Sequence, residues 1–87
     1  MKILCTELFE NQLKDILLKF SKEDFTATKS FKLYLDTIII NIPTKADKYK
    51  KSIYFNDEDI KDIPHENFTI IFFIDKEKET YLILSII

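Results

Sequence analysis

The apolar positions in the first half of the chain follow the spacing of two helices. After Thr6, a residue type that caps helix N-termini, one helix face is marked by Phe9, Leu13, Ile16, Leu17 and Phe20. The same i, i+4, i+7, i+8, i+11 spacing returns at Phe31, Leu35, Ile38, Ile39 and Ile42. Ser21, which opens the capping-box-like stretch "SKED", is the expected cap of the second helix, and Pro43 is expected to end it. With a short strand at 2–6 before it, this pattern predicts a helical hairpin.

The second half of the chain alternates short apolar runs with polar turns. Residues 44–52, "TKADKYKKS", form a lysine-rich connection. Strands are then expected at 60–63, 68–75 and 80–87, after a strand-like stretch at 53–55, with turns at 56–59, 64–67 and 76–79. We write the predicted order as β-α-α-β-β-β, in one domain that spans residues 1–87. It indicates an α+β fold, an antiparallel sheet with the N-terminal helical hairpin packed on one face.

Alternation along the last two strands assigns side chains to the two faces of this sheet. In 68–75, the residues expected to face the helices are Phe68, Ile70, Phe72 and Ile74, and Thr69, Ile71, Phe73 and Asp75 face the other way. In 80–87, Leu82, Leu84 and Ile86 oppose Tyr81, Ile83, Ser85 and Ile87. The second face is too apolar for one that meets water. Either other segments of the chain cover it, or a partner protein docks there.

Composition excludes several classes of function. The chain has 13 basic and 15 acidic residues, a net charge of −2, whereas a general nucleic-acid binder would be basic. Every Lys or Arg position is a lysine, which cannot form the bidentate guanidinium fork. The absence of glycine excludes Walker and dinucleotide-binding loops, and we expect no cofactor. No apolar run is long enough to cross a membrane, and no residue spacing suits zinc or calcium.

The single cysteine and the single histidine are weak candidates for chemistry. Cys5 has no cysteine partner, which together with an N-terminus unlike a signal peptide favours the cytoplasm. Its place beside Ile3 in the first strand favours an apolar packing role over a reactive thiolate. His65 is expected at a solvated turn beside Glu66, with no convergent catalytic groups.

The lysine-rich connection is a candidate binding patch. Its lysines, interleaved with Tyr49 and Tyr54, are Lys45, Lys48, Lys50 and Lys51. Such a patch can contact an acidic partner or offer aromatic rings for stacking. The alternative is an ordinary solvated loop, because lysine is a common surface residue and the acidic run Asp57, Glu58 and Asp59 follows at once.

Three stretches of the sequence resemble a known family of proteins. "NIP", then "KYKKSIYFNDEDIKDI", then "ENFTIIFFID" are similar to ParE/RelE-type plasmid-stabilisation toxins, and the element order is that of the RelE/ParE superfamily. The likeness covers almost the whole chain and is most specific over residues 41–75. The resemblance implies a toxin of a type II toxin–antitoxin module, which a cognate antitoxin wraps and neutralises. It further implies one of two targets, DNA gyrase for ParE-type members or ribosome-bound mRNA for RelE-type members.

Departures from the family pattern favour binding over RNA cleavage. Where RelE-type members carry an arginine after the aromatic that opens the third strand, this chain has Thr69. Family members often add a His, Tyr or Arg after the last strand, and here the sequence reads "LSII". The leading expectation is therefore a non-enzymatic toxin directed at gyrase. The alternatives are a ribosome-dependent RNase that uses Lys50, Lys51, Lys61 and Tyr54, or a non-toxic remnant that only binds antitoxin.

The residues expected to contact the antitoxin or the target come from the lysine-rich connection and the second face of the sheet. They are Lys48, Tyr49, Lys51, Thr69, Ile71, Phe73, Tyr81 and Ile83. We expect no metal at this surface.

Overall fold

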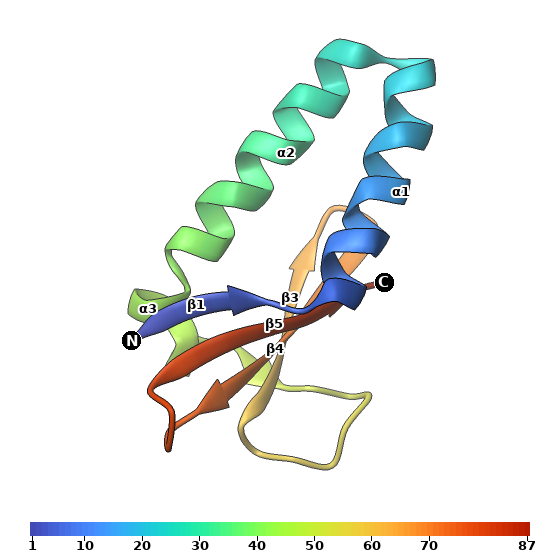
Figure 1. Ribbon diagram of the computed structural model, residues 1–87. Helices are drawn as coiled ribbons and strands as arrows, with labels where there is room; N and C mark the ends of the chain where they lie inside the picture. The colour runs from blue at the N-terminus through green and yellow to red at the C-terminus, as the bar shows by residue number, and fades with distance from the viewer.

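A computed structural model describes all residues from 1 to 87. The elements in chain order are β1 (Lys2–Cys5), α1 (Glu7–Glu23), α2 (Phe25–Ile40), α3 (Ile42–Lys45), the 3-10 turn η1 (Ala46–Lys48), β2 (Lys50–Lys51), β3 (Ile60–His65), β4 (Phe68–Asp75) and β5 (Thr80–Ile86). The α1–α2 hairpin rises from one side of the sheet, so that the molecule measures 41 × 23 × 22 Å (Figure 1). The predicted α+β architecture and the helical hairpin are confirmed.

The sheet is mixed rather than wholly antiparallel. Its strand order is β1-β5-β4-β3-β2, and β1 pairs with β5 in the parallel direction while the other pairs are antiparallel. The expectation of a purely antiparallel sheet was therefore wrong at one edge. Hydrophobic alternation reports which face a residue occupies but carries no information about strand direction, which depends on where the chain re-enters the sheet.

The helix boundaries follow from two capping side chains. The Thr6 hydroxyl accepts a hydrogen bond from the N–H of Phe9 at 3.0 Å and so begins α1 as predicted. The cap of α2 is Asp24 rather than Ser21, because the Asp24 carboxylate accepts from the N–H of Ala27 at 3.0 Å. Ser21 stays within α1, where its hydroxyl donates to the carbonyl of Leu18. A serine that bonds back into its own helix cannot cap the next one.

The connection after α2 is more ordered than the sequence indicated. α2 ends at Ile40, and Pro43 lies in the first turn of α3, where its missing N–H removes no helical hydrogen bond. Ile42 and Ala46 from this segment are buried in the core. The connection therefore packs against the sheet before the chain enters β2.

The strand expected at 53–55 is absent, and the strand that pairs with β3 is Lys50–Lys51. The reason is that side chains accept hydrogen bonds from backbone N–H groups that would otherwise bond to a neighbouring strand. The N–H of Ile53 donates to the Asp62 carboxylate at 3.0 Å, and the N–H of Tyr54 donates to the Ser52 hydroxyl at 3.1 Å. With these donors occupied, the chain leaves the ladder after Lys51.

The core lies between the helices and one face of the central strands. Ile70 and Phe72 of β4 have no exposed surface and share a cluster with Phe31 and Leu35 of α2. Phe68 and Ile74 pack against this cluster, so the predicted helix-facing side of β4 is confirmed. Burying such large side chains supplies the main driving force for docking the hairpin on the sheet.

The predicted faces of β5 were wrong in its first half, because a β-bulge interrupts the alternation. Ile71 and Phe72 are consecutive in β4, yet they pair with Ser85 and Ile83, so that Leu84 has no partner. Ile83 and Ile86 therefore lie on the same side, in the core, and Tyr81 joins them there.

The same bulge is bonded to the start of α1. The Thr6 N–H donates to the carbonyl of Ile83 at 3.0 Å, and the Thr6 hydroxyl donates to the carbonyl of Leu84 at 2.6 Å. One turn and a half further along α1, the Gln12 amide oxygen accepts from the N–H of Ile86 at 3.0 Å. Residues of the helix thus replace β1 as hydrogen-bond partners of β5 once β1 has ended.

Thr6→Ala should lower the free energy of unfolding by about 1–3 kcal/mol, since it removes a helix cap and a hydrogen bond to the bulge together. Urea denaturation followed by circular dichroism measures the change. Ser21→Ala is the matched control, because that hydroxyl bonds only within its own helix. Equal effects of the two substitutions would contradict the role given to Thr6.

Candidate partner-binding surface

A groove lined by lysines lies where η1, β2 and β3 meet. It encloses about 420 Å³ and is lined by Lys48, Tyr49, Lys50, Lys51, Ile53, Asp62 and Pro64, the residues we name the lysine groove. Tyr49 fixes its floor, because its ring packs edge-on against core residue Phe72 with ring centroids 6.0 Å apart. Three of the binding residues expected from the sequence, Lys48, Tyr49 and Lys51, are brought together here.

The charges of the groove are only partly balanced within the chain. Lys51 Nζ lies 3.0 Å from Asn56 Oδ1 and 3.5 Å from the carboxylate of Glu58. Lys48 and Lys50 are exposed and form no ion pair in the chain. Asp62, directly opposite Lys50 in the β2–β3 ladder, has one carboxylate oxygen that is buried without a hydrogen-bond partner. Two free cations and a rigid floor suit a partner that carries negative charge.

Next to the groove, three large apolar residues are displayed on a loop. Ile53, Tyr54 and Phe55, which we name the apolar loop, are 84%, 51% and 44% exposed. Both ends of the segment are anchored: the Ser52 N–H donates to the carbonyl of Ile60 at 2.7 Å, and the Asp59 carbonyl accepts from the N–H of Ile74 at 2.8 Å. The exposed apolar side chains are thus held by an ordered backbone.

The four candidate catalytic groups do not converge on one point. Lys51 is directly opposite Lys61 in the ladder, and Lys61 is in turn opposite Phe72, which places both lysines on the helix-facing side at the sheet edge. Lys50 points to the opposite face, and Tyr54 lies on the apolar loop. The arrangement places two positive charges side by side, and a carboxylate beside them, that of Glu58, is ion-paired with Lys51 at 3.5 Å.

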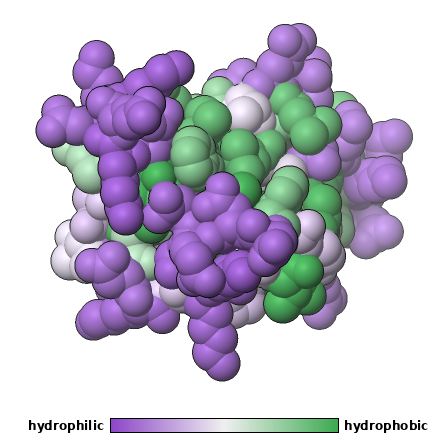
Figure 2. All heavy atoms as spheres, turned by 90° about the horizontal axis from the view of Figure 1, so that it is seen from below, coloured by the Kyte–Doolittle hydropathy of each residue, from purple (hydrophilic) through white to green (hydrophobic).

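The second face of the sheet is apolar and has no helix over it (Figure 1). Ile71 is 2% exposed, whereas Thr69 and Phe73 on either side of it are half-buried. Register continues this row from Phe73 through Leu82 to Leu4, which is 49% exposed. Seen from below, the molecule shows hydrophobic side chains at its surface with hydrophilic groups around them (Figure 2). Tyr81 and Ile83 were expected on this face and are instead buried against the helices.

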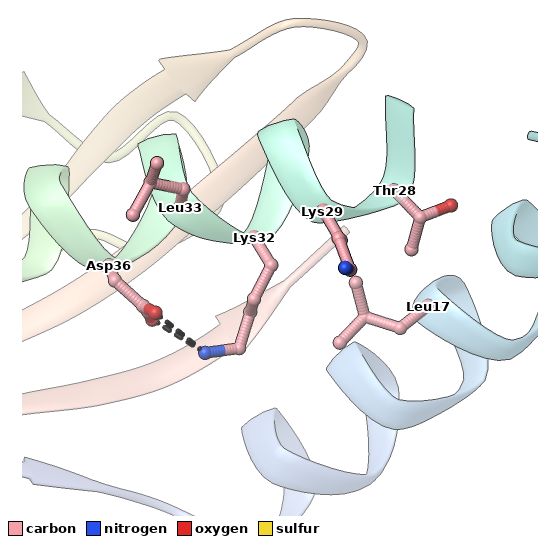
Figure 3. A pocket seen from close by; sticks show the side chains of 6 residues that line it. All are labelled: Leu17, Thr28, Lys29, Lys32, Leu33 and Asp36. Carbon is pink, nitrogen blue, oxygen red and sulfur yellow. Dashed lines mark hydrogen bonds and ion pairs between the residues drawn. The ribbon is translucent and has the colours of Figure 1, made fainter. Parts of the chain in front are cut away.

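A further hollow, which no pattern in the sequence indicated, lies between the two helices. It encloses about 340 Å³ and is lined by Leu17, Thr28, Lys29, Lys32, Leu33 and Asp36 (Figure 3). Lys32 Nζ and the Asp36 carboxylate form an ion pair of 2.7 Å within it. This ion pair offsets the charge of Lys32 within the hollow.

Comparison with protein families gives a match over almost the full length of the chain. The family model described as "ParE toxin of type II toxin-antitoxin system, parDE" matches residues 3–87. The chain belongs to the ParE toxin family. No curated protein matches it. The family makes this chain the toxin component of a type II toxin–antitoxin module and implies a cognate antitoxin as its partner.

In this ParE-family chain, His65 is a core residue rather than a turn residue. It ends β3, is buried, and its ring lies 4.9 Å from that of Phe31. The turn is made by Glu66 and Asn67, with Glu66 at a φ of 55°. Lys61, Ile63 and His65 alternate along β3 and all face the helices. This alternation could have predicted that His65 is buried, but residues 64–67 were predicted to form a turn.

The residues of the ParE-family chain form neither a metal-binding cluster nor a membrane-spanning helix. No group of three or more His, Cys, Asp or Glu side chains is placed to hold a metal ion. No helix is long and apolar enough to cross a membrane.

Cys5 of the ParE-family chain is exposed on the edge strand β1. Partial burial of its sulfur raises the pKa of the thiol, the negative charge of Glu10 raises it further, and Lys32 opposes both. A raised pKa lowers the fraction of thiolate at neutral pH, and the thiolate is the reactive form.

Alkylation of Cys5 by iodoacetamide should therefore be slower at pH 8 than that of an unstructured cysteine peptide, and its pH midpoint should be higher. Glu10→Gln should move the midpoint down, but not to the peptide's value, because burial is the larger cause. The rate should approach the peptide's rate in denaturing urea. A midpoint below that of the peptide would contradict the described surroundings of the thiol.

Proposed function

We propose that this ParE-family toxin inhibits growth by binding its target rather than by cutting RNA, and that the target is DNA gyrase. The observation that carries the proposal is the apolar loop, in which Ile53, Tyr54 and Phe55 are exposed on an anchored backbone. Exposing three large apolar residues in a row is costly in water unless a partner covers them. A prearranged loop also loses little conformational entropy on binding.

The arrangement of polar groups supports binding over catalysis. Cleavage of RNA through its 2′-hydroxyl needs a base, an acid and a group that stabilises the charged phosphorane, all around one phosphate. Here Lys51 is occupied by Asn56, Lys50 points to the other face, and His65 is buried against Phe31. The surface offers charge and apolar contact, which are what a protein partner recognises.

We propose further that the cognate antitoxin neutralises the toxin by covering the lysine groove and the apolar loop together. The exposed Lys48 and Lys50 favour an acidic segment, and the adjacent Ile53 and Phe55 favour apolar side chains within that segment. In this proposal residues 1–87 are a single toxin domain that acts in the cytoplasm, and the module stabilises a plasmid.

Expression of the chain without antitoxin should arrest growth and induce a DNA-damage response, because blocked gyrase leaves broken DNA. Colony counts and a damage-responsive reporter measure both effects, and co-expression of the cognate antitoxin should restore growth. Arrest with ribosome-bound mRNA cut at the A site would replace the binding mechanism with the RNase alternative. No arrest at all would favour the non-toxic remnant.

Phe55→Ala combined with Ile53→Ala should weaken target and antitoxin binding by about 30-fold or more, if these residues behave as typical hot spots. Calorimetry or surface plasmon resonance measures the loss. The matched control is Phe25→Ala with Leu33→Ala, since these side chains are also exposed but lie on α2. The apolar loop would have no such role if both pairs changed affinity equally.

A further inference from the structure

We infer that the free edge of β1 pairs with the β1 edge of a second copy of this chain, forming an antiparallel, two-fold symmetric dimer with one continuous sheet. The two edges of the five-stranded sheet are β1 and β2. Unpaired backbone groups along an edge are a template for another strand. The two edges differ in how they are protected.

The β2 side is closed to self-association. Its two residues are Lys50 and Lys51, whose charges repel a second copy. Past β2, the continuing edge of β3 carries Pro64, which has no N–H to donate. β1 has neither a proline nor a bulge, and Lys2 at its start is its only charge.

Two hydrogen bonds fix which backbone groups of β1 are free. The N–H of Lys2 donates to the carbonyl of Glu79, and the N–H of Thr6 donates to the carbonyl of Ile83, each at 3.0 Å. Because alternate residues of a strand point to opposite neighbours, Ile3 and Cys5 direct their N–H and C=O groups away from β5. Neither residue has a backbone hydrogen bond to a turn or loop.

These free groups favour the register in which both residues of each chain are paired. If Ile3 of one chain is opposite Cys5 of its partner, the pair exchanges two hydrogen bonds and the symmetric pair exchanges two more. Leu4 then meets Leu4 of the second copy on the two-fold axis. Cys5 is exposed even though its side chain is on the helix-facing side, opposite Ile83, so the helices leave this edge open.

Side chains in this register are complementary in character and in charge. Leu4, 49% exposed, would cover its symmetry mate and extend the apolar row that includes Leu82 and Phe73. Lys2 would lie opposite Thr6 of the second copy and beside Glu7, the exposed first residue of the second copy's α1. Because the dimer is two-fold symmetric, the contact between Lys2 and Glu7 occurs twice.

The dimer is expected to be weak. Two four-residue strands bury less than a standard interface, so we expect a dissociation constant on the order of 100 μM. The lysine grooves of the two copies lie at the opposite ends of the joined sheet, because β2 is the edge farthest from β1. Self-association therefore leaves both proposed partner sites free, and it stands or falls independently of the proposed function.

Disulfide trapping tests the register. Leu4→Cys in a Cys5→Ser background should cross-link readily on mild oxidation, because opposed non-hydrogen-bonded residues have Cα atoms about 4.5 Å apart. Native Cys5 should not, since its symmetry mate is about 9 Å away in this register, past the roughly 7 Å limit for a disulfide. The control is Ser30→Cys with Cys5→Ser, an exposed position on α2. Cross-linking of Leu4→Cys no faster than this control, or slower than native Cys5, overturns the proposal.

Sedimentation equilibrium up to millimolar concentration tests the affinity. Leu4→Lys, which places like charges on the axis, should raise the dissociation constant about tenfold or more. Lys2→Glu should weaken the dimer, and adding Glu7→Lys should restore it, while Leu33→Lys on α2 leaves it unchanged. Circular dichroism confirms that each variant folds. If the protein is a monomer over the whole concentration range, the proposal is wrong. If in addition the Leu4→Lys variant binds the antitoxin more weakly, the β1 edge is a binding site for the antitoxin and not for a second copy.

Discussion

The structure depends on how β5 satisfies its backbone after its neighbour β1 has ended. β1 pairs with β5 only as far as Cys5 opposite Ile83. From there Thr6 and Gln12 take over, and their side chains bond the carbonyl of Leu84 and the N–H of Ile86. A buried strand cannot leave such groups unpaired. These bonds fasten the bulged strand to the start of α1, so the cap Thr6 and Gln12 together join the helical layer to the β-layer.

The bulge decides what the two faces of the sheet contain. By inserting Leu84, it places Tyr81, Ile83 and Ile86 together against the helices. The helix-facing side is consequently filled, and the other side keeps a shorter apolar row that ends at the β1 edge. At the β1 edge this row ends on Leu4, which is exposed. The opposite margin, at β2, is charged.

That charged margin is where the chain departs most from regular structure. Side chains of Ser52, Asp62 and Asp57 accept hydrogen bonds from loop N–H groups, which hold the apolar loop without any glycine. The tight turns elsewhere use Glu66 and Glu79 at positive φ, which costs a non-glycine residue about 1–2 kcal/mol each.

The sequence by itself determined the helical hairpin, the helix-facing side of β4 and the family, because these rest on apolar spacing and on local motifs. It could not determine the parallel direction of β1, the unpaired Leu84 or the buried position of His65. The cap at Asp24 and the loss of the strand at 53–55 were also beyond it. In each of these cases a hydrogen bond or a contact between separate segments outweighs local preference, and only the tertiary structure brings those segments together.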